Sequence, residues 1–332
     1  MTNIAINGFG RIGRQAFRAA LARKKVRVVG INDLTDTKTL AHLLKYDTAY
    51  GTYEKHVDYD EKNIIVDKKK YPVFAEKDPA QLPWKKLNVD VVLECTGRFT
   101  KKEEAELHLK AGAKKVVISA PAKGGGVPTY VVGVNSDDVK KEESLAINNA
   151  SCTTNCISPI MAVLQDKFGI EKAMMTTVHG YTADQNLQDG PHKDLRRARA
   201  AAENIVPTTT GAAVATTEVI PELQGLFDGV AIRVPVPTVS LSDITVVLEQ
   251  EVTKEQVNQV FRDAAKEARF TGVLTVTDEP LVSSDFIGNP HSAIVDLSLT
   301  NVVGGNLVKV VAWYDNEAGY ANRLVEIAEM FV

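Results

Sequence analysis

Cysteine is scarce in this chain: 332 residues contain three, too few for a disulfide framework. Long apolar runs are also missing, since none approaches the ~18 residues that cross a bilayer. The first eight residues lack both the basic and the apolar region of a signal peptide. We therefore expect a soluble cytoplasmic protein with free thiols and no membrane association.

An excess of charge of either sign is missing as well, because 39 basic residues nearly balance 42 acidic ones. No global field attracts a polyanion, so we expect no nucleic-acid partner, and any phosphate site must be local. The composition, 44% hydrophobic and 24% charged, is ordinary for a globular protein. Because the length exceeds the roughly 250 residues at which single cores split, we expect two domains.

A glycine-rich motif directly follows a short strand-like segment, residues 2–7. Gly8, Gly10 and Gly13 form the pattern G-x-G-x-x-G, and a helix-like segment follows. Such a turn brings backbone N–H groups close to a pyrophosphate, although a simple strand-to-helix turn is the alternative. Asp33 lies twenty positions after Gly13, where its carboxylate would hold a ribose 2′-hydroxyl and repel a 2′-phosphate. The motif therefore predicts a dinucleotide site that prefers NAD to NADP.

Strand-like and helix-like segments alternate through the first half of the chain, which predicts a doubly wound α/β sheet of Rossmann type. The main expected elements are hairpins within 56–76, a buried strand at 89–94, a helix at 101–111, and strands at 115–118 and 145–148. We expect the three glycines at 124–126 to form a flexible loop. Residues 1–150 are therefore predicted to be the NAD-binding domain.

The second half lacks this alternation. Long β-branched runs at 244–251, 294–300 and 307–313 are separated by loops and by a helix-like segment, 253–267. This predicts an α+β catalytic domain, residues 151–316, with a mainly antiparallel sheet. A final amphipathic helix, within residues 317–332, must pack its apolar face on one of the two domains.

Cys152 follows the last strand of the first half, between residues that favour a helix N-terminus, Ser151 and Thr153. A helix N-terminus lowers the pKa of a thiol, but Pro159 implies a helix that is kinked or begins later. Cys156 lies one helical turn on. Zinc would need further paired ligands, and a disulfide over one turn is strained, so a nucleophilic Cys152 or two buried thiols remain as interpretations.

A nucleophilic thiol needs a base, and His179 ends a strand-like run. Further on, the basic segment 193–199 could be a solvated helix face or an anion site. In the segment 207–213, three threonines stand immediately before a helix-like run, and this arrangement favours a bound phosphate. Arg233, within a strand, would be costly to bury unless it met an anion.

Taken together, these motifs resemble the phosphorylating glyceraldehyde-3-phosphate dehydrogenase family from end to end. The matching segments are INGFGRIGR at 6–14, SCTTNC at 151–156, His179 with Thr182, PTTTGAA at 207–213 and WYDNE at 313–317. The resemblance implies that Cys152 attacks the aldehyde to give a thiohemiacetal while His179 accepts the proton. Hydride transfer to NAD then leaves a thioester, which inorganic phosphate cleaves to 1,3-bisphosphoglycerate.

The resemblance also implies the binding residues. Thr182, Arg196 and Arg233 would hold the substrate phosphate, and Ser151, Thr153, Thr210 and Gly211 the attacking phosphate. The cofactor would be bound by Gly8, Gly10, Arg11, Ile12, Gly13, Asp33, Lys77, Thr96, Ser119 and Asn316. No metal is implied. The resemblance also implies that the C-terminal helix, within 317–332, packs back on the NAD-binding domain, and the family is usually a homotetramer.

One departure from the family pattern is the loop at 123–128, which we would expect to be more acidic. Two other functions compete with this interpretation. Erythrose-4-phosphate dehydrogenase shares the cysteine and the histidine but releases its acyl group to water. A catalytically silent NAD-binding or surface-adhesion protein is the alternative from another class, and the retention of both Cys152 and His179 argues against it.

Overall fold

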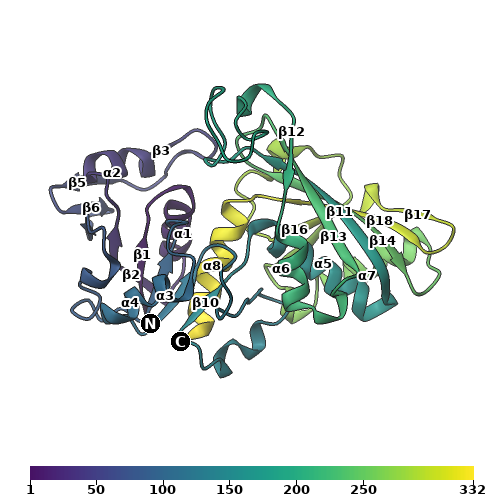
Figure 1. The fold of residues 1–332 in the computed structure, drawn as a ribbon, viewed down its shortest axis with the longest axis horizontal. Helices are drawn as coiled ribbons and strands as arrows, with labels where there is room; N and C mark the ends of the chain where they lie inside the picture. The colour runs from purple at the N-terminus through teal and green to yellow at the C-terminus, as the bar shows by residue number, and fades with distance from the viewer. The chain divides into compact units, whose positions relative to one another are not determined.

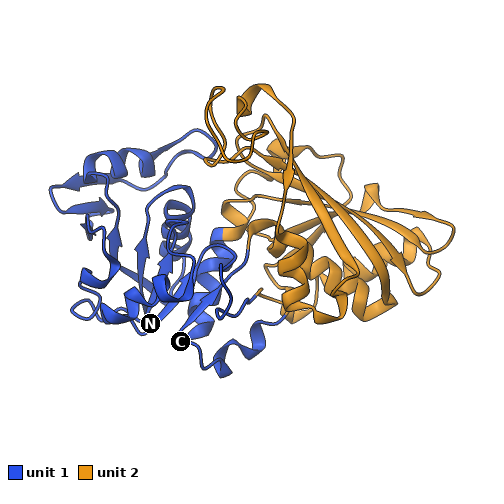
Figure 2. Ribbon diagram, in the orientation of Figure 1, with its two compact units in different colours: residues 1–130, 135–150, 321–332 blue, residues 131–134, 151–320 orange.

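The computed structural model describes residues 1–332, and the chain divides into two compact units (Figure 2). Unit 1 contains residues 1–130, 135–150 and 321–332. Unit 2 contains residues 131–134 and 151–320. An eight-stranded sheet forms the centre of each unit (Figure 1).

The sheet of unit 1 has the strand order β10-β9-β8-β1-β2-β7-β6-β5. Neighbours from β10 to β7 are parallel, and β7, β6 and β5 form an antiparallel meander at one edge. The predicted doubly wound sheet and its hairpins are therefore confirmed. The strands are β1 (Thr2–Asn7), β2 (Val26–Asn32), β5 (Val57–Asp60), β6 (Asn63–Val66), β7 (Lys69–Phe74), β8 (Val91–Glu94), β9 (Lys115–Ile118) and β10 (Ala146–Asn148).

Strand β8 is buried along its whole length, as expected for a parallel strand covered on both faces. The other elements of unit 1 are α1 (Arg11–Leu21), α2 (Thr37–Lys45), a small ribbon of β3 (Tyr46–Asp47) and β4 (Gly51–Thr52), and two 3-10 turns, η1 (Pro79–Gln81) and η2 (Ser136–Lys141). The single helix expected at 101–111 is wrong. It is two short helices, α3 (Lys102–Ala105) and α4 (Leu107–Lys110), which meet at Glu106, where ψ is −12° and the turn is tighter than in an α-helix.

The sheet of unit 2 has the order β12-β13-β11-β14-β18-β16-β15, and β17 pairs with β18. It is mainly antiparallel, as predicted, with parallel pairs only between β11 and β13 and between β15 and β16. Its strands are β11 (Ile170–Gly180), β12 (Val206–Thr209), β13 (Phe227–Val234), β14 (Ser240–Leu248), β15 (Leu274–Thr277), β16 (Ala293–Asp296), β17 (Asn301–Val303) and β18 (Leu307–Tyr314).

The expectation of one strand over 294–300 is wrong. Strand β16 ends at Asp296, whose carboxylate accepts a hydrogen bond from the Ser298 N–H at 3.2 Å. This bond closes the 3-10 turn η7 (Leu297–Leu299) in place of an extended strand.

Helices α5 (Cys152–Phe168), α6 (Ala212–Val219) and α7 (Lys254–Ala264) pack on the sheet of unit 2. Helix α8 (Ala318–Phe331) begins in unit 2 and ends in unit 1, where Arg23 pairs with Glu326. The remaining turns are η3 (Ala201–Glu203), η4 (Pro221–Leu223), η5 (Ala268–Phe270) and η6 (Ser283–Phe286). None of the helices combines the length and apolar character required to cross a membrane.

Candidate active site

Cys152 and His179 lie together in unit 2. The Cys152 sulfur is 3.5 Å from Nε2 of His179, although 27 residues separate them in the chain. Cys152 is the first residue of α5, and His179 is the next-to-last residue of β11. The contact therefore joins a helix N-terminus to a strand end and makes a nucleophile–base pair geometrically possible.

The start of α5 is fixed by Ser151, whose hydroxyl accepts the Thr154 N–H at 3.1 Å. The prediction that Ser151 caps this helix is confirmed, and the alternative of a later start is wrong. The helix continues through Pro159 to residue 168. Because proline has no N–H, the proline affects the interior of the helix and leaves the first turn, which carries Cys152, intact.

Burial decides the resting protonation of the pair. It raises the pKa of the Cys152 thiol, an effect opposed by the charge of Arg233 and by hydrogen bonds at Thr153. Burial and, to a smaller extent, the charge of Arg233 together lower the pKa of His179 to about 3. At neutral pH the pair is therefore a thiol beside a neutral imidazole, so the helix N-terminus alone does not produce a thiolate.

Arg233 lies next to His179 because β11 and β13 are parallel neighbours in which these two residues are register partners. Nδ1 of His179 is 2.7 Å from Nη1 of Arg233 and 2.7 Å from the Gly180 carbonyl oxygen. An arginine can only donate, so its contact requires a bare Nδ1 and a proton on Nε2. The contact with the carbonyl requires the opposite tautomer, in which Nε2 is free to accept the thiol proton.

Tyr314 connects the first turn of α5 to β11. Its hydroxyl lies 2.8 Å from the Thr153 hydroxyl and 2.8 Å from the Thr177 hydroxyl. Its ring packs edge-on against the His179 ring, with centroids 5.9 Å apart. The sequence placed Tyr314 only inside a family motif. Its role as a bridge depends on strand register, for which the sequence carries no local signal.

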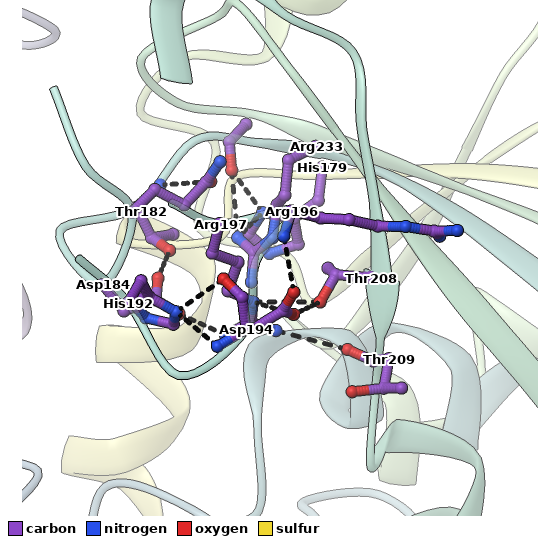
Figure 3. A network of polar contacts seen from close by, with 12 residues as sticks. His179, Thr182, Asp184, His192, Asp194, Arg196, Arg197, Thr208, Thr209 and Arg233 are labelled. Carbon is purple, nitrogen blue, oxygen red and sulfur yellow. Dashed lines mark hydrogen bonds and ion pairs between the residues drawn. The ribbon is translucent and has the colours of Figure 1, made fainter. Parts of the chain in front are cut away.

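A polar network surrounds Thr182, Asp184 and Arg197 (Figure 3). Asp184 accepts hydrogen bonds from the Thr182 hydroxyl and from the Arg197 guanidinium. Burial raises the pKa of Asp184, but the Thr182 hydroxyl and the charges of Arg197 and Arg233 outweigh it and leave the pKa below its usual value. The carboxylate is therefore held ionised among donors that could equally bind a phosphate.

The network contains Arg197, the neighbour in sequence of the predicted substrate residue Arg196. Nε of Arg197 donates to the Thr208 hydroxyl at 2.9 Å, and Nη2 donates to the Thr209 carbonyl oxygen at 3.3 Å. The Arg196 side chain is exposed and extends away from these residues (Figure 3). The two arginines are neighbours in a basic run, and only the fold distinguishes the one that turns inward.

Thr210 and Gly211 stand at the start of α6. Gly211 is the N-cap residue, and the Thr210 hydroxyl accepts the Ala212 N–H at 3.2 Å. Helix α6 packs beside α5, where the hydroxyls of Ser158 and Thr216 lie 3.2 Å apart. A helix start flanked by hydroxyls is suited to an anion.

The glycine-rich motif in unit 1 fits a dinucleotide. A Cβ atom on Gly13 would lie 2.0 Å from the Gly8 carbonyl oxygen, and one on Gly8 would lie 2.8 Å from the Thr96 nitrogen, so both sites exclude side chains. At Gly10, by contrast, a Cβ would meet nothing within 4 Å, so the surface above the helix start is open. These are the tight turn and the open approach that a pyrophosphate needs.

Asp33 directly follows β2, whose last residue is Asn32. Its carboxylate accepts the Phe9 N–H at 2.8 Å and the Thr35 N–H at 3.0 Å, which fixes it beside the glycine-rich loop. Arg11 pairs with Asp47 at 2.7 Å. The other predicted cofactor residues of unit 1 are Ile12 in α1, the exposed Lys77 after β7, Thr96 after β8 and Ser119 after β9.

Asn316 lies in unit 2, after β18. Its carbonyl oxygen accepts a hydrogen bond from the Ser240 hydroxyl at 3.0 Å, and the same hydroxyl oxygen accepts the Gly180 N–H at 3.2 Å. Ser240 thus links Asn316 to the residue after His179. Because its oxygen is engaged, Asn316 presents its amide N–H₂ as a donor.

The remaining cysteines have no reactive setting. Cys156 is fully buried and Cys95 partly so; burial raises the pKa of both thiols, and all three cysteines are free. No three His, Cys, Asp or Glu side chains lie close enough together to hold a metal ion.

Comparison with known proteins identifies the family to which both halves belong. Residues 2–102 match the family model "Glyceraldehyde 3-phosphate dehydrogenase, NAD binding domain", and residues 151–316 match "Glyceraldehyde 3-phosphate dehydrogenase, C-terminal domain".

The chain is similar along its whole length to enzymes with this name. It is 56% identical over 328 residues to glyceraldehyde-3-phosphate dehydrogenase 1 of Bacillus cereus, covering 99% of this chain and 98% of the relative. It is 54% identical to the Geobacillus stearothermophilus enzyme, covering 98% and 96%, and 57% identical to the Thermotoga maritima enzyme, covering 100% and 99%. The chain therefore belongs to the glyceraldehyde-3-phosphate dehydrogenase family, as its motifs predicted, and its cofactor is NAD.

Proposed function

We propose that this protein oxidises D-glyceraldehyde 3-phosphate with NAD and inorganic phosphate to 1,3-bisphosphoglycerate, a step of glycolysis. The observation that carries the proposal is the 3.5 Å contact between the Cys152 sulfur and Nε2 of His179, with Arg233 2.7 Å from the other ring nitrogen. A catalytically silent binding protein has no use for a thiol, a base and a permanent cation in this arrangement.

The thiol is activated by proton transfer to His179. Arg233 holds a proton on Nε2 while it donates to Nδ1. When Arg233 turns to the substrate phosphate, the imidazole loses its Nε2 proton to solvent and takes one on Nδ1 from solvent, so that Nδ1–H donates to the Gly180 carbonyl oxygen and Nε2 becomes free. The thiol proton then passes to Nε2, and the sulfur forms a bond to the aldehyde carbon, whose oxygen takes up the proton. Substrate binding and activation are thus coupled through one arginine.

Bound NAD would supply the hydride acceptor for the thiohemiacetal carbon, and the acyl group would then remain on Cys152 as a thioester. His179 withdraws the hydroxyl proton in that step. An oxygen of inorganic phosphate then attacks the thioester carbon, and the Cys152 sulfur leaves as a thiolate that is reprotonated by His179. Asn316, oriented by Ser240, would donate to the nicotinamide carboxamide.

Two anion sites serve the two phosphates. For the substrate phosphate we propose Thr182 and Arg233 together with Arg197, which replaces Arg196, because Arg197 already binds the carboxylate of Asp184 in the network of Figure 3. For the attacking phosphate we propose the residues at the starts of α5 and α6, which are Ser151, Thr153, Thr210 and Gly211.

The cofactor site is proposed to contain Gly8, Gly10, Arg11, Ile12, Gly13, Asp33, Lys77, Thr96 and Ser119. NAD is favoured over NADP because the Asp33 carboxylate would repel a 2′-phosphate. We propose residues 1–150, with the helix within 317–332, as the NAD-binding domain and residues 151–316 as the catalytic domain.

The test is NADH formation from glyceraldehyde 3-phosphate with and without phosphate. We expect turnover to require phosphate and Cys152→Ser to lose at least about a thousandfold in kcat/KM. Equal rates without phosphate would favour release of the acyl group to water, as in erythrose-4-phosphate dehydrogenase. Activity that survives Cys152→Ser would refute the mechanism.

We also propose a cytoplasmic homotetramer. A reducing compartment suits three free thiols, one of which must stay reduced to act. Large apolar side chains on the loops of unit 2 support self-association, since Leu187 is 82% exposed, Leu195 81% and Ile205 71%. Light scattering on the protein as it elutes from a size-exclusion column measures the mass of the assembly directly.

A further inference from the structure

A row of buried polar side chains crosses the carboxyl end of the unit 1 sheet. Asn7, Asn32 and Glu94 are the last residues of β1, β2 and β8, and Asn7 is the register partner of both others. All three are at most 5% exposed. They are therefore side by side at the ends of adjacent parallel strands, and each comes directly before the loop that follows its strand.

Hydrogen bonds connect the row without a gap. Nδ2 of Asn7 donates to the Glu94 carboxylate at 2.6 Å, and Nδ2 of Asn32 donates to Oδ1 of Asn7 at 2.7 Å. At the far end, the Asn32 side chain donates to the Glu76 carbonyl oxygen and accepts the Glu76 N–H, both at 2.9 Å. The row thus extends from β8 to the segment after β7.

The Glu94 carboxylate is the charged end of the row and has four donors. Oε1 accepts the Thr96 N–H at 2.7 Å and the Thr96 hydroxyl at 2.5 Å, while Oε2 accepts from Asn7 and from His108 at 3.0 Å. Nδ1 of His108 is itself 3.0 Å from the donor Nε1 of Trp84. Since the indole can only donate, Nδ1 is bare and Nε2 carries the proton toward Glu94.

Each member of the row lies one or two residues before a residue of the proposed cofactor site. Asn7 precedes Gly8, Asn32 precedes Asp33, Glu76 precedes Lys77, and Glu94 lies two residues before Thr96. Thr96 is the most completely fixed, because its hydroxyl also accepts the Arg98 N–H at 3.1 Å. With its proton committed to Glu94, that hydroxyl can only accept from a ligand.

We propose that Glu94 is a positioning residue for NAD binding. It fixes the backbone of Thr96 and the direction in which the Thr96 hydroxyl donates. Through Asn7 and Asn32 it also fixes the spacing between the glycine-rich loop and Asp33. This inference rests on the proposed function, since it concerns the same cofactor.

Stability alone does not explain a buried carboxylate in this place. A buried ion is costly, and well-packed apolar residues of similar volume are often no worse for folding. A fully satisfied polar network instead restricts the backbone to one arrangement. The network around Glu94 lies at the carboxyl ends of the strands, where open α/β sheets bind their ligands.

The experiment replaces the carboxylate and measures NAD binding separately from catalysis. Glu94→Gln keeps the size of the side chain but replaces one carboxylate oxygen by an NH₂ group. This group is a donor and would face the donors that now bond to Glu94. We expect the Kd for NAD, by calorimetry on the intact protein without substrate, to rise at least about tenfold. The KM for NAD should rise similarly, while kcat at saturating NAD stays within about twofold. Glu103→Gln, on the exposed start of α3, is the matched control and should change neither.

A double-mutant cycle tests the route through Thr96. In the background of Thr96→Val, which lacks the hydroxyl, Glu94→Gln should weaken NAD binding by less than about threefold. An equal effect in both backgrounds would overturn the route through the Thr96 hydroxyl, and an unchanged Kd in folded Glu94→Gln would overturn the whole inference. Parent protein that fails to bind NAD would instead contradict the proposed function.

Hydrogen–deuterium exchange on the parent protein keeps the inference testable if Glu94→Gln does not fold. The Thr96 amide is already bonded to Glu94, so without NAD it should exchange about as slowly as the amides of β8. If that amide exchanged rapidly without NAD and became protected only on NAD binding, the site would not be preorganised and Glu94 would not position it.

Discussion

Three side chains set the chemistry at the residue scale. Burial opposes ionisation of Cys152 and of His179, so neither carries a charge at rest. Arg233 is the permanent charge among them, and it favours the thiolate while it disfavours the imidazolium. Before substrate binds, the fraction of Cys152 present as thiolate therefore depends on Arg233, because the neutral His179 carries no charge that could favour it.

Arg233→Met should accordingly slow the alkylation of Cys152. Removal of the cation raises the pKa of the thiol further, so less thiolate is present at a given pH. We expect the rate with iodoacetamide at pH 7, without substrate, to fall roughly tenfold, and the pH–rate profile to move to higher pH. Arg199→Met removes an exposed arginine that pairs with Asp189 and serves as the control. An unchanged profile in Arg233→Met would mean that the arginine does not influence the sulfur.

His179 should make the protein sensitive to mild acid. Its folded pKa, about 3, lies below the ~6.5 of an unfolded histidine, so between these values the unfolded state binds the extra proton. The free energy of unfolding therefore falls as pH decreases through this window. From pH 7 to 5 the parent should lose about 2 kcal/mol more than His179→Asn, which has no proton to bind.

Urea unfolding at fixed protein concentration and several pH values measures this difference. Other titrating groups are common to both proteins and cancel in the comparison. Parallel pH dependences would show that His179 takes up its proton without unfolding.

The elements themselves were largely predictable, and their ends and interruptions were not. The short apolar runs that alternate with helix-like segments predicted the parallel strands of unit 1, and Ser151 marked the start of α5. By contrast, the break at Glu106 and the turn after Asp296 depend on local hydrogen bonds that compete with the regular element. The inward direction of the Arg197 side chain and the bridge at Tyr314 depend on backbone direction and strand register, which a single sequence does not encode locally.

Two glycines of one loop should separate folding from binding. Gly13→Ala places a Cβ 2.0 Å from the Gly8 carbonyl oxygen, so the loop must shift, and we expect a loss of about 2–3 kcal/mol in stability. Gly10→Ala meets nothing within 4 Å and has an ordinary φ of −73°, so stability should change by no more than about 1 kcal/mol.

Gly10→Ala should weaken NAD binding although it leaves stability nearly unchanged. Its added methyl group occupies the surface that a pyrophosphate must approach, so the affinity for NAD should fall at least about tenfold in a protein of nearly normal stability. Urea unfolding and calorimetry measure the two quantities on the same samples. If Gly10→Ala bound NAD as tightly as the parent, this loop would not contact the pyrophosphate.

At the scale of the whole molecule, the sheet of unit 2 presents an apolar face away from its helices. Alternate residues of β14 from Ser240 to Leu248 are buried, and those between them are partly exposed. The neighbours on the exposed side include Met174, 67% exposed, and Val230, 51% exposed. The face carries one ion pair, between Lys309 and Asp243 at 2.7 Å. Its remaining apolar side chains favour contact with a second copy of the chain.

Charges placed on this face should prevent the proposed assembly. In Met174→Lys with Val230→Lys, two cations on adjacent strands would have to be desolvated against the equivalent pair of a symmetric partner. We expect light scattering to give a smaller mass than the parent at micromolar concentration, with an unchanged far-ultraviolet circular dichroism spectrum. Leu145→Lys, a comparable change on unit 1 at a residue 49% exposed, is the control and should retain the parent mass. Equal masses for the parent and the double variant would exclude this face as an interface, because a symmetric contact would bring like charges together in every copy.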